Sequence, residues 1–310
     1  DAAVVRVCCE KFVIRAMRLA IRDPSSTEML FALGLGDQVV AVTHECDFPP
    51  EAAGLPHLSS TVIPEGLSPA AIDAEVKRQV AEGNALYSLR EDVLERVEPD
   101  LIIAQDVCAV CAVSYDDVTE VAARLPSRPA VLRQDPTGLA EVLDNAIEVA
   151  EAAGIPDAGV RLRDGLESRI EAVRSAVEGQ GTPRVLALEW LDPPFTGGHW
   201  VPEMIEAAGG IDVAGGPGEK SAEVNWESLR ELSPEVVVVM PCGYYARESA
   251  EQAREYMDRI RSLDAEMVFA VDAAASFSRP GPRLVEGIEA LAHILHPRQV
   301  PLAEGLELFL

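Results

Sequence analysis

The chain has 310 residues, 48% of them hydrophobic and 25% charged, and this composition predicts folded domains. Its 52 Asp and Glu residues outnumber 26 Lys and Arg residues, which gives a formal net charge of −26 at pH 7. This charge repels nucleic-acid backbones and anionic membrane surfaces, so it excludes nucleic acid as an expected partner. No apolar run approaches the roughly 20 residues of a spanning helix, so we expect no direct membrane insertion.

Residues 1–16 have no assigned role in the sequence. They lack a basic start, an apolar middle and a small-residue cleavage site in that order, which is the pattern of a secretory signal. We therefore expect a cytoplasmic protein if the chain is complete, and a periplasmic or other extracytoplasmic one if a presequence was removed. In a chain of this length the six cysteines need not form a disulfide framework, and reduced thiols fit a cytoplasm: Cys8, Cys9, Cys46, Cys108, Cys111 and Cys242.

Apolar runs of strand length alternate with helical patterns, which predicts βαβ units and mainly parallel sheets. Residues 137–179 are rich in helix formers, with an interruption near Gly154 and Pro156, and they predict a long helical connector. A helical connector is stiffer than a Gly/Ser linker, so we expect modest flexing instead of a large hinge motion. The predicted strands are 38–43, 100–104, 130–133, 184–189, 235–240 and 267–271.

The two halves of the chain resemble each other. Leu94–Ile103 matches Leu229–Val238 in residue class at every position, and each segment is typical of a short helix that a proline closes before a buried strand. We therefore expect an α/β fold of two doubly wound lobes, with a ligand cleft between them. The expected divisions are an unassigned segment 1–16, an N-terminal lobe 17–136, a helical connector 137–180 and a C-terminal lobe 181–310.

The start of the N-terminal lobe contains a helix-capping motif, and before it charged residues where a strand is expected. Ser25-Ser26-Thr27-Glu28 fits a capping box, in which Ser25 accepts from the Glu28 amide and Glu28 reaches back, and Gly34 and Gly36 end the helix. The amides of this helix start also suit an anionic group of a ligand, although capping alone explains the motif. Arg18, Arg22 and Asp23 place charges where the first strand of a lobe is expected, which argues against a strand there.

The unusual residues follow the predicted strands, and the carboxyl ends of parallel strands line the ligand crevice. Aromatic residues are 5% of the chain, yet most of those in the second half lie at these strand ends. This concentration suits a large, flat, partly apolar ligand, and the alternative is that each ring covers a lobe edge. The predicted ligand-binding residues are Ser25, His44, Glu45, Asp47, Trp190, Phe195, His199, Trp200, Tyr244, Phe277 and Arg279.

Soft ligands for a metal ion are also present. His44, Cys46, Cys108 and Cys111 form a four-ligand set suited to zinc, so a protein that binds zinc or iron is the alternative hypothesis. Against it, a single CxxC is present and two loops must meet. An imidazole of His44 or His199 also suits a metal that the ligand carries, and a loop histidine without ligand is the plain alternative.

Catalysis is the less favoured reading. Asp106, Glu45 and His199 are acid–base candidates, but such residues also occur at strand ends in ordinary binding clefts. The chain shows no nucleophile elbow, P-loop or dinucleotide fingerprint. We therefore expect a binding protein and not an enzyme.

Six segments together resemble the cobalamin-binding branch of the class III periplasmic-binding-protein family, and the similarity covers nearly everything from Met17 onward: 24–36, 43–50, 105–111, 189–195, 198–204 and 277–282. The resemblance implies two α/β lobes, a bridging helix and cobalamin or a related corrinoid or tetrapyrrole held between them. We also expect no required cofactor and a monomer. If the chain is exported, the resemblance suggests an ABC-importer membrane subunit whose basic residues dock on acidic residues of both lobes. Arg279, Asp47 and Tyr244 would then reach the polar rim of the ligand.

Overall fold

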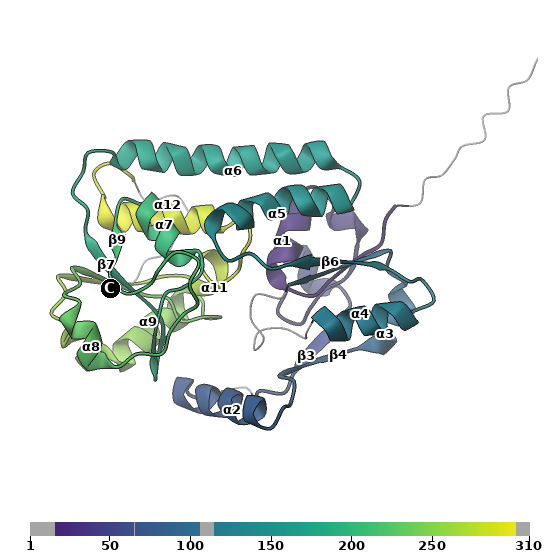
Figure 1. Cartoon of the computed structure of the whole chain (residues 1–310), viewed down its shortest axis with the longest axis horizontal. Helices are drawn as coiled ribbons and strands as arrows, with labels where there is room; N and C mark the ends of the chain where they lie inside the picture. Colours follow the sequence, from purple (N-terminus) through teal and green to yellow (C-terminus); the bar gives the residue numbers. More distant parts are fainter. Residues whose placement is uncertain (1–15, 65, 106–114, 302–310) are drawn as a thin grey trace, which may run out of the picture.

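The computed structural model describes residues 16–64, 66–105 and 115–301, and the predicted residues Asp106, Cys108 and Cys111 lie outside these ranges. Two α/β lobes lie beside each other along a pair of long helices (Figure 1). The predicted fold class is confirmed. No helix in the described ranges is long and apolar enough to cross a membrane.

The N-terminal lobe is built on a sheet of four parallel strands in the order β2-β1-β5-β6. The inner strands read Leu-Ala-Ile and Leu-Ile-Ile-Ala-Gln, and their near-continuous apolar runs are buried because helices cover both faces. The elements are β1 (Leu19–Ile21), α1 (Pro24–Ala32), η1 (Gly36–Gln38), β2 (Val39–Ala41), η2 (Pro50–Gly54), α3 (Glu91–Val97), β5 (Leu101–Gln105), α4 (Tyr115–Arg124) and β6 (Ala130–Gln134).

The doubt about a first strand was wrong. Leu19, Ala20 and Ile21 are fully buried in β1, between β2 and β5. Arg18 and Arg22 flank this three-residue strand, so both charged residues lie just outside the strand, one at each end. The charges therefore mark the strand ends, and Arg22 emerges at the carboxyl end.

The capping-box prediction was also wrong. Asp23 is the N-cap of α1, and its side chain accepts from the Ser26 amide at 2.7 Å, with Pro24 at the first helical position. Glu28 is not available to reach back, because it pairs with two arginines of the other lobe. Gly34 ends the helix as expected, at a positive φ of 77°.

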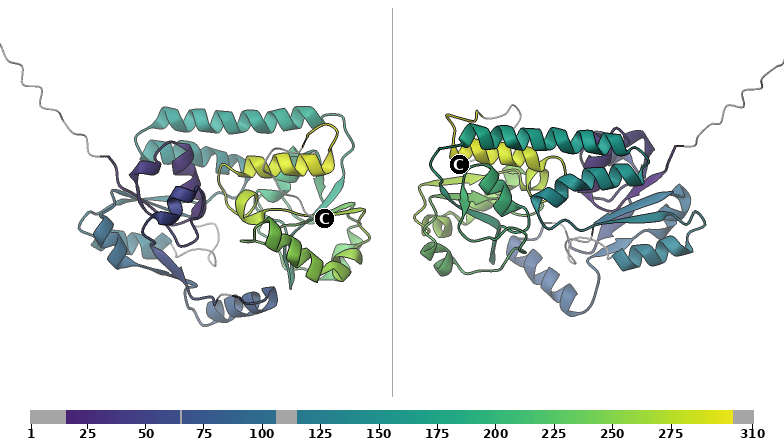
Figure 2. Two further views of the ribbon diagram at one scale, coloured as in Figure 1. Left: turned by 180° about the vertical axis from the view of Figure 1, so that it is seen from behind. Right: turned by 45° about the horizontal axis from the view of Figure 1, so that its top comes forward.

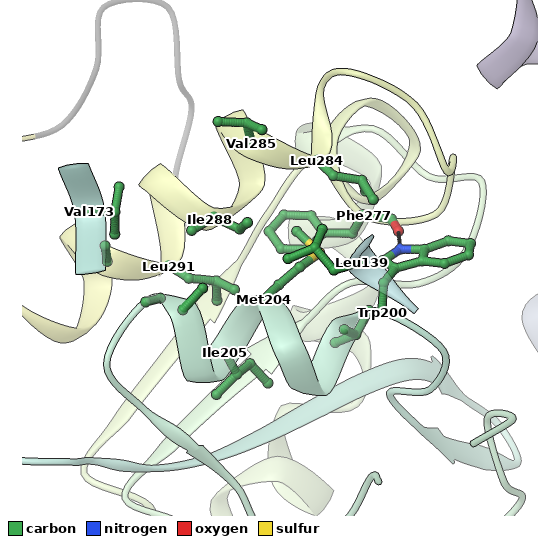
Figure 3. Close-up of a cluster of buried hydrophobic side chains, with 14 of the residues drawn as sticks. Leu139, Val173, Trp200, Met204, Ile205, Phe277, Leu284, Val285, Ile288 and Leu291 are labelled. Atoms are coloured by element: carbon green, nitrogen blue, oxygen red, sulfur yellow. Dashed lines mark hydrogen bonds between the residues drawn. The ribbon is translucent and has the colours of Figure 1, made fainter. Parts of the chain in front are cut away.

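The C-terminal lobe repeats the design with the strand order β11-β10-β7-β8, where β9 also pairs with β7 and β8 alone runs antiparallel. Figure 3 shows its main core, where Met204, Ile288 and Phe277 meet between α7 and α12. The elements are β7 (Arg184–Leu191), β8 (Pro194–Thr196), α7 (Val201–Ala207), β9 (Ile211–Asp212), α8 (Trp226–Glu231), β10 (Val236–Val239), α9 (Ala246–Glu255), α10 (Met257–Arg261), β11 (Met267–Ala270), α11 (Ala273–Ser276) and α12 (Leu284–Leu295).

The internal repeat is visible at the level of hydrogen bonds. In the N-terminal lobe the Arg18 amide donates to Asp100 Oδ2 at 2.8 Å, and in the C-terminal lobe the Arg184 amide donates to Glu235 Oε2 at 2.8 Å. Asp100 and Glu235 occupy matching positions of the repeat, directly before β5 and β10. The two lobes therefore share their local construction as well as their strand pattern.

The connector is a helical hairpin. It consists of α5 (Leu139–Ala152) and α6 (Pro156–Val177), which turn at Gly154 and run along both lobes (Figures 1 and 2). Side chains of α5 enter both cores: Leu139 and Val142 that of the C-terminal lobe, Ala146 and Val149 that of the N-terminal lobe. A hairpin anchored in both cores is a stiff support, and modest flexing stays a prediction.

One excursion of the N-terminal lobe was not predicted. The antiparallel strands β3 (Ser59–Thr61) and β4 (Tyr87–Leu89) carry α2 (Pro69–Ala81) away from the sheet, on the side opposite to α5 and α6 (Figure 1). There Lys77 Nζ pairs with Glu223 Oε2 of the C-terminal lobe at 2.8 Å. The lobes are thus in contact on both sides of the molecule.

Candidate ligand cleft

A pocket of about 550 Å³ lies between the lobes, and residues of both line it. Its walls come from the carboxyl ends of β1, β5 and β7 and from the loops beyond them, which is where open parallel sheets bind ligands. The volume falls in the range of about 300–1,000 Å³ that is typical of small-molecule sites.

The wall from the N-terminal lobe is polar and tightly ordered. Asp23 Oδ1 accepts from Ser25 Oγ at 2.6 Å and Oδ2 accepts from Ser26 Oγ at 2.8 Å, and burial raises the pKa of this carboxyl. Arg22 is 4% exposed, and burial lowers the pKa of its guanidinium to about 10, against the opposing effect of Asp23 and Asp117. Gln105, the last residue of β5, completes this wall.

The facing wall belongs to the C-terminal lobe. Glu189 near the end of β7 accepts from the Gly198 amide at 3.1 Å and from the hydroxyl of Ser221, and all three residues line the pocket. His199 follows with a positive φ of 54° and a half-buried ring. Burial, and secondarily the charge of Lys220, lowers the pKa of this imidazole, so the neutral form is favoured near pH 7.

A charged cluster joins the lobes at one end of the pocket. Arg279 of the C-terminal lobe donates to Asp47 Oδ1 at 2.7 Å and to Glu28 Oε1 at 3.3 Å, both in the N-terminal lobe. Arg283 donates to Glu28 Oε2 at 2.8 Å and lies over the Phe48 ring at 4.1 Å. Since Glu28 is buried between the two guanidinium groups, this cluster holds the lobes together through charge.

The structure brings seven of the eleven predicted ligand-binding residues to the pocket, and Trp200 and Phe277 among them are nearly buried. Both belong to the core cluster of the C-terminal lobe, and Trp200 Nε1 donates to the Phe277 carbonyl at 2.7 Å. The seven are Ser25, Glu45, Asp47, His199, Trp200, Phe277 and Arg279.

The other four predicted residues lie outside the pocket lining. His44 Nδ1 is hydrogen-bonded to Ser59 Oγ at 2.8 Å, which holds the ring against β3. Trp190 packs on Tyr244 with ring centroids 5.7 Å apart, and Phe195 is paired in β8. The rings of Trp190 and Tyr244 therefore pack on each other within the C-terminal lobe, which agrees with the alternative interpretation of their position.

Several pocket residues are absent from the predicted set, and two of them carried a sequence signal. Gln105 and Glu189 are polar residues at the ends of buried strands. Tyr245, at 38% exposure, lines the pocket in place of its neighbour Tyr244, a choice that sequence alone does not reveal. The lining residues outside the predicted ligand-binding set are Arg22, Asp23, Pro24, Tyr87, Gln105, Glu189, Gly198, Ser221, Cys242, Gly243, Tyr245, Ala274, Ser278 and Pro280.

The proposed zinc set stays a prediction, because Cys108 and Cys111 fall outside the described residues. Cys46 is buried, its Sγ lies 3.1 Å from the hydroxyls of Thr27 and Thr43, and burial raises the pKa of the thiol to about 11. Within the described part of the chain, no three His, Cys, Asp or Glu side chains are grouped to hold a metal ion.

Comparisons with known proteins place the chain in a family. Residues 19–265 match the family model described as "Periplasmic binding protein". The vitamin B12-binding protein of Vibrio cholerae is 21% identical over 90% of this chain and 89% of its own length. An uncharacterized ABC transporter substrate-binding lipoprotein, YvrC of Bacillus subtilis, is 22% identical over 88% of this chain and 78% of its own length.

Solved structures show the same architecture. The periplasmic vitamin B12 binding protein BtuF of Vibrio cholerae is similar with a TM-score of 0.65 and 20% identity, covering 90% of this chain and 96% of that chain. The periplasmic heme-binding protein RhuT of Roseiflexus sp. RS-1 has a TM-score of 0.67 and 23% identity, covering 91% and 99%. The chain belongs to the periplasmic binding protein family.

Proposed function

We propose that this protein captures cobalamin, or a related corrinoid or tetrapyrrole, between its lobes and delivers it to an ABC importer without catalysing a reaction. The observation that carries the proposal is the pocket of about 550 Å³ built from the strand ends of both lobes. Several relatives are named for binding vitamin B12 or haem, both of which are built on a large flat ring around a metal, and one similar structure is named as a possible iron-binding protein.

The pocket lining suits such a ring. Tyr87 of the N-terminal lobe and Tyr245 of the C-terminal lobe both line it, so each lobe offers an aromatic side chain to a flat ligand. His199 is the predicted metal-ligating imidazole that lines the pocket, and its favoured neutral form is the one that binds cobalt or iron.

The partner and location follow from the same relatives. One named relative is periplasmic and another is a substrate-binding lipoprotein of an ABC transporter, which supports work outside the cytoplasm and an importer membrane subunit as partner. The net charge of −26 gives this protein acidic surface to offer to basic residues of that subunit.

Isothermal calorimetry and thermal denaturation with cyanocobalamin, aquocobalamin and haemin test the proposal. We expect saturable one-site heat with at least one of them, and stabilisation by about 2.7 kcal/mol at a free ligand concentration of 100 times Kd. Absence of both heat and stabilisation with all three ligands at high concentration would overturn it. With aquocobalamin, a change in absorption that His199→Ala abolishes would support ligation by the imidazole.

A further inference from the structure

Arg22 sits in the pocket as a buried cation. It follows β1 directly, at the carboxyl end of an inner strand, and its amide is fixed by the Ile103 carbonyl at 2.9 Å. The residue is 4% exposed and yet belongs to the pocket lining. Its Nε and Nη1 atoms are buried and have no hydrogen-bond partner among the residues that the structure describes. A guanidinium held out of water with unused donors is costly for the ligand-free protein.

The neighbouring carboxylate is already engaged. Asp23 Oδ1 accepts from the Ser25 hydroxyl at 2.6 Å and from the Ser26 amide at 2.7 Å, and Oδ2 accepts from the Ser26 hydroxyl at 2.8 Å. These bonds direct the carboxylate to the start of α1. Asp23 therefore offsets the charge of Arg22 from nearby without using its donors.

The other acidic residues of the pocket are also engaged by protein groups. Asp47 accepts from Arg279, Glu189 accepts from Ser221 and the Gly198 amide, and Glu45 accepts from the Tyr87 hydroxyl at 3.3 Å. Within the described ranges, Arg22 is thus the charged group of this pocket that has buried hydrogen-bonding atoms without a partner. The cleft wall of this strongly acidic protein therefore carries a buried positive charge.

We propose that Arg22 anchors an oxyanion of the ligand, a carboxylate or a phosphate, against the N-terminal wall of the pocket. This inference rests on the proposed function of the cleft and deepens it by naming a required chemical group. A planar guanidinium binds such a group through two parallel hydrogen bonds, either end-on through Nη1 and Nη2 or side-on through Nε and Nη2. The end-on geometry uses Nη1 and the side-on geometry uses Nε, and these are the two atoms that lack a partner.

A charged residue at the pocket wall influences which ligands bind, so Arg22 is assigned as a specificity-determining residue of this protein.

The test uses cyanocobalamin, which carries a phosphodiester, cobyric acid and haemin, which carry carboxylates, and cobinamide, which carries neither group. We expect Arg22→Gln to weaken binding of the recognised oxyanion ligand about tenfold or more and that of cobinamide less than about twofold. A loss confined to cyanocobalamin identifies the phosphodiester, and a loss confined to cobyric acid or haemin identifies a carboxylate. Arg247→Gln, which removes the same charge from an exposed side chain, is the matched control and should change no affinity.

The outcomes separate this inference from the proposed function. An equal loss on all bound ligands, or no loss on any, overturns the anchor and leaves the binder in place. If the unaltered protein binds none of the four, the proposed function fails and the anchor fails with it. A second readout is the ligand-free Tm of Arg22→Met, which we expect to be unchanged or higher. A fall of several degrees would show that Arg22 serves the fold, and would overturn the anchor.

Discussion

Arg279 donates to Asp47 at 2.7 Å, and this contact joins a loop of the C-terminal lobe to a loop of the N-terminal lobe at the edge of the pocket. The same arginine reaches Glu28, which is 2% exposed and also pairs with Arg283. The two carboxylates of this cluster differ sharply in burial, since the Asp47 side chain is 44% exposed.

Glu28→Gln should therefore cost far more stability than Asp47→Asn. The first change leaves two partly buried guanidinium groups without a buried counter-charge, at about 3–5 kcal/mol. The second removes the charge of the more exposed carboxylate and leaves Glu28 paired with Arg279, at about 0–1 kcal/mol. Urea unfolding of both variants measures the difference, and equal losses would show that the cluster does not depend on its buried carboxylate.

Tyr245→Ala should weaken ligand binding roughly tenfold, because it removes an aromatic contact from the pocket wall. Tyr244→Ala is the matched control, since this ring packs on Trp190 outside the lining. It should lower stability while leaving affinity within about twofold. Calorimetry on the two variants decides, and the reverse order of effects would place the ligand elsewhere.

Acidification should destabilise the ligand-free protein partly through His199. Burial lowers the pKa of this imidazole in the folded state, so the unfolded state binds the proton more readily. The stability is present above the ordinary pKa of about 6.5 and is lost as the pH falls through the lowered folded value. The decrease in Tm between pH 7.5 and pH 5.5 should be smaller in His199→Gln than in the unaltered protein; an equal decrease would contradict this.

Two glycines of α6 should respond in opposite directions to alanine. A Cβ at Gly159 would lie 2.5 Å from the Ala146 carbonyl oxygen and 2.6 Å from the Ala150 Cβ, so Gly159→Ala should cost about 1–3 kcal/mol. A Cβ at Gly165 meets nothing within 4 Å, so Gly165→Ala should gain about 0.5–1 kcal/mol from helix propensity. Thermal denaturation compares them, and a neutral Gly159→Ala would show that α5 and α6 separate easily.

The fold was largely readable from sequence because its strands are buried on both faces. Runs such as Val236–Val239 signal a parallel sheet without any knowledge of their neighbours. The strand β1 was not predicted, because it has only three apolar residues and a charged residue on each side. Asp23-Pro24 did carry a helix-start signal, which the capping-box pattern two residues later obscured.

The site was less readable than the fold. Their position after predicted strands placed Asp47, His199 and Arg279 at the cleft, and all three line the pocket. The orientation of loop side chains depends on contacts between distant residues, so Tyr244 and Tyr245 are equivalent in sequence and different in space. The importance of Arg22 depends on Asp23 being engaged by Ser25 and Ser26, a relationship that only three-dimensional contacts reveal.

The α5 and α6 hairpin determines how the molecule can be divided. Leu139 and Val142 complete one core while Ala146 and Val149 complete the other, so a cut at any point of α5 leaves both lobes with exposed apolar surface. We therefore expect that neither lobe folds on its own, although each has its own sheet. A chimaera that exchanges one lobe with a relative must redesign the shared helix, and the whole protein should melt in one cooperative transition.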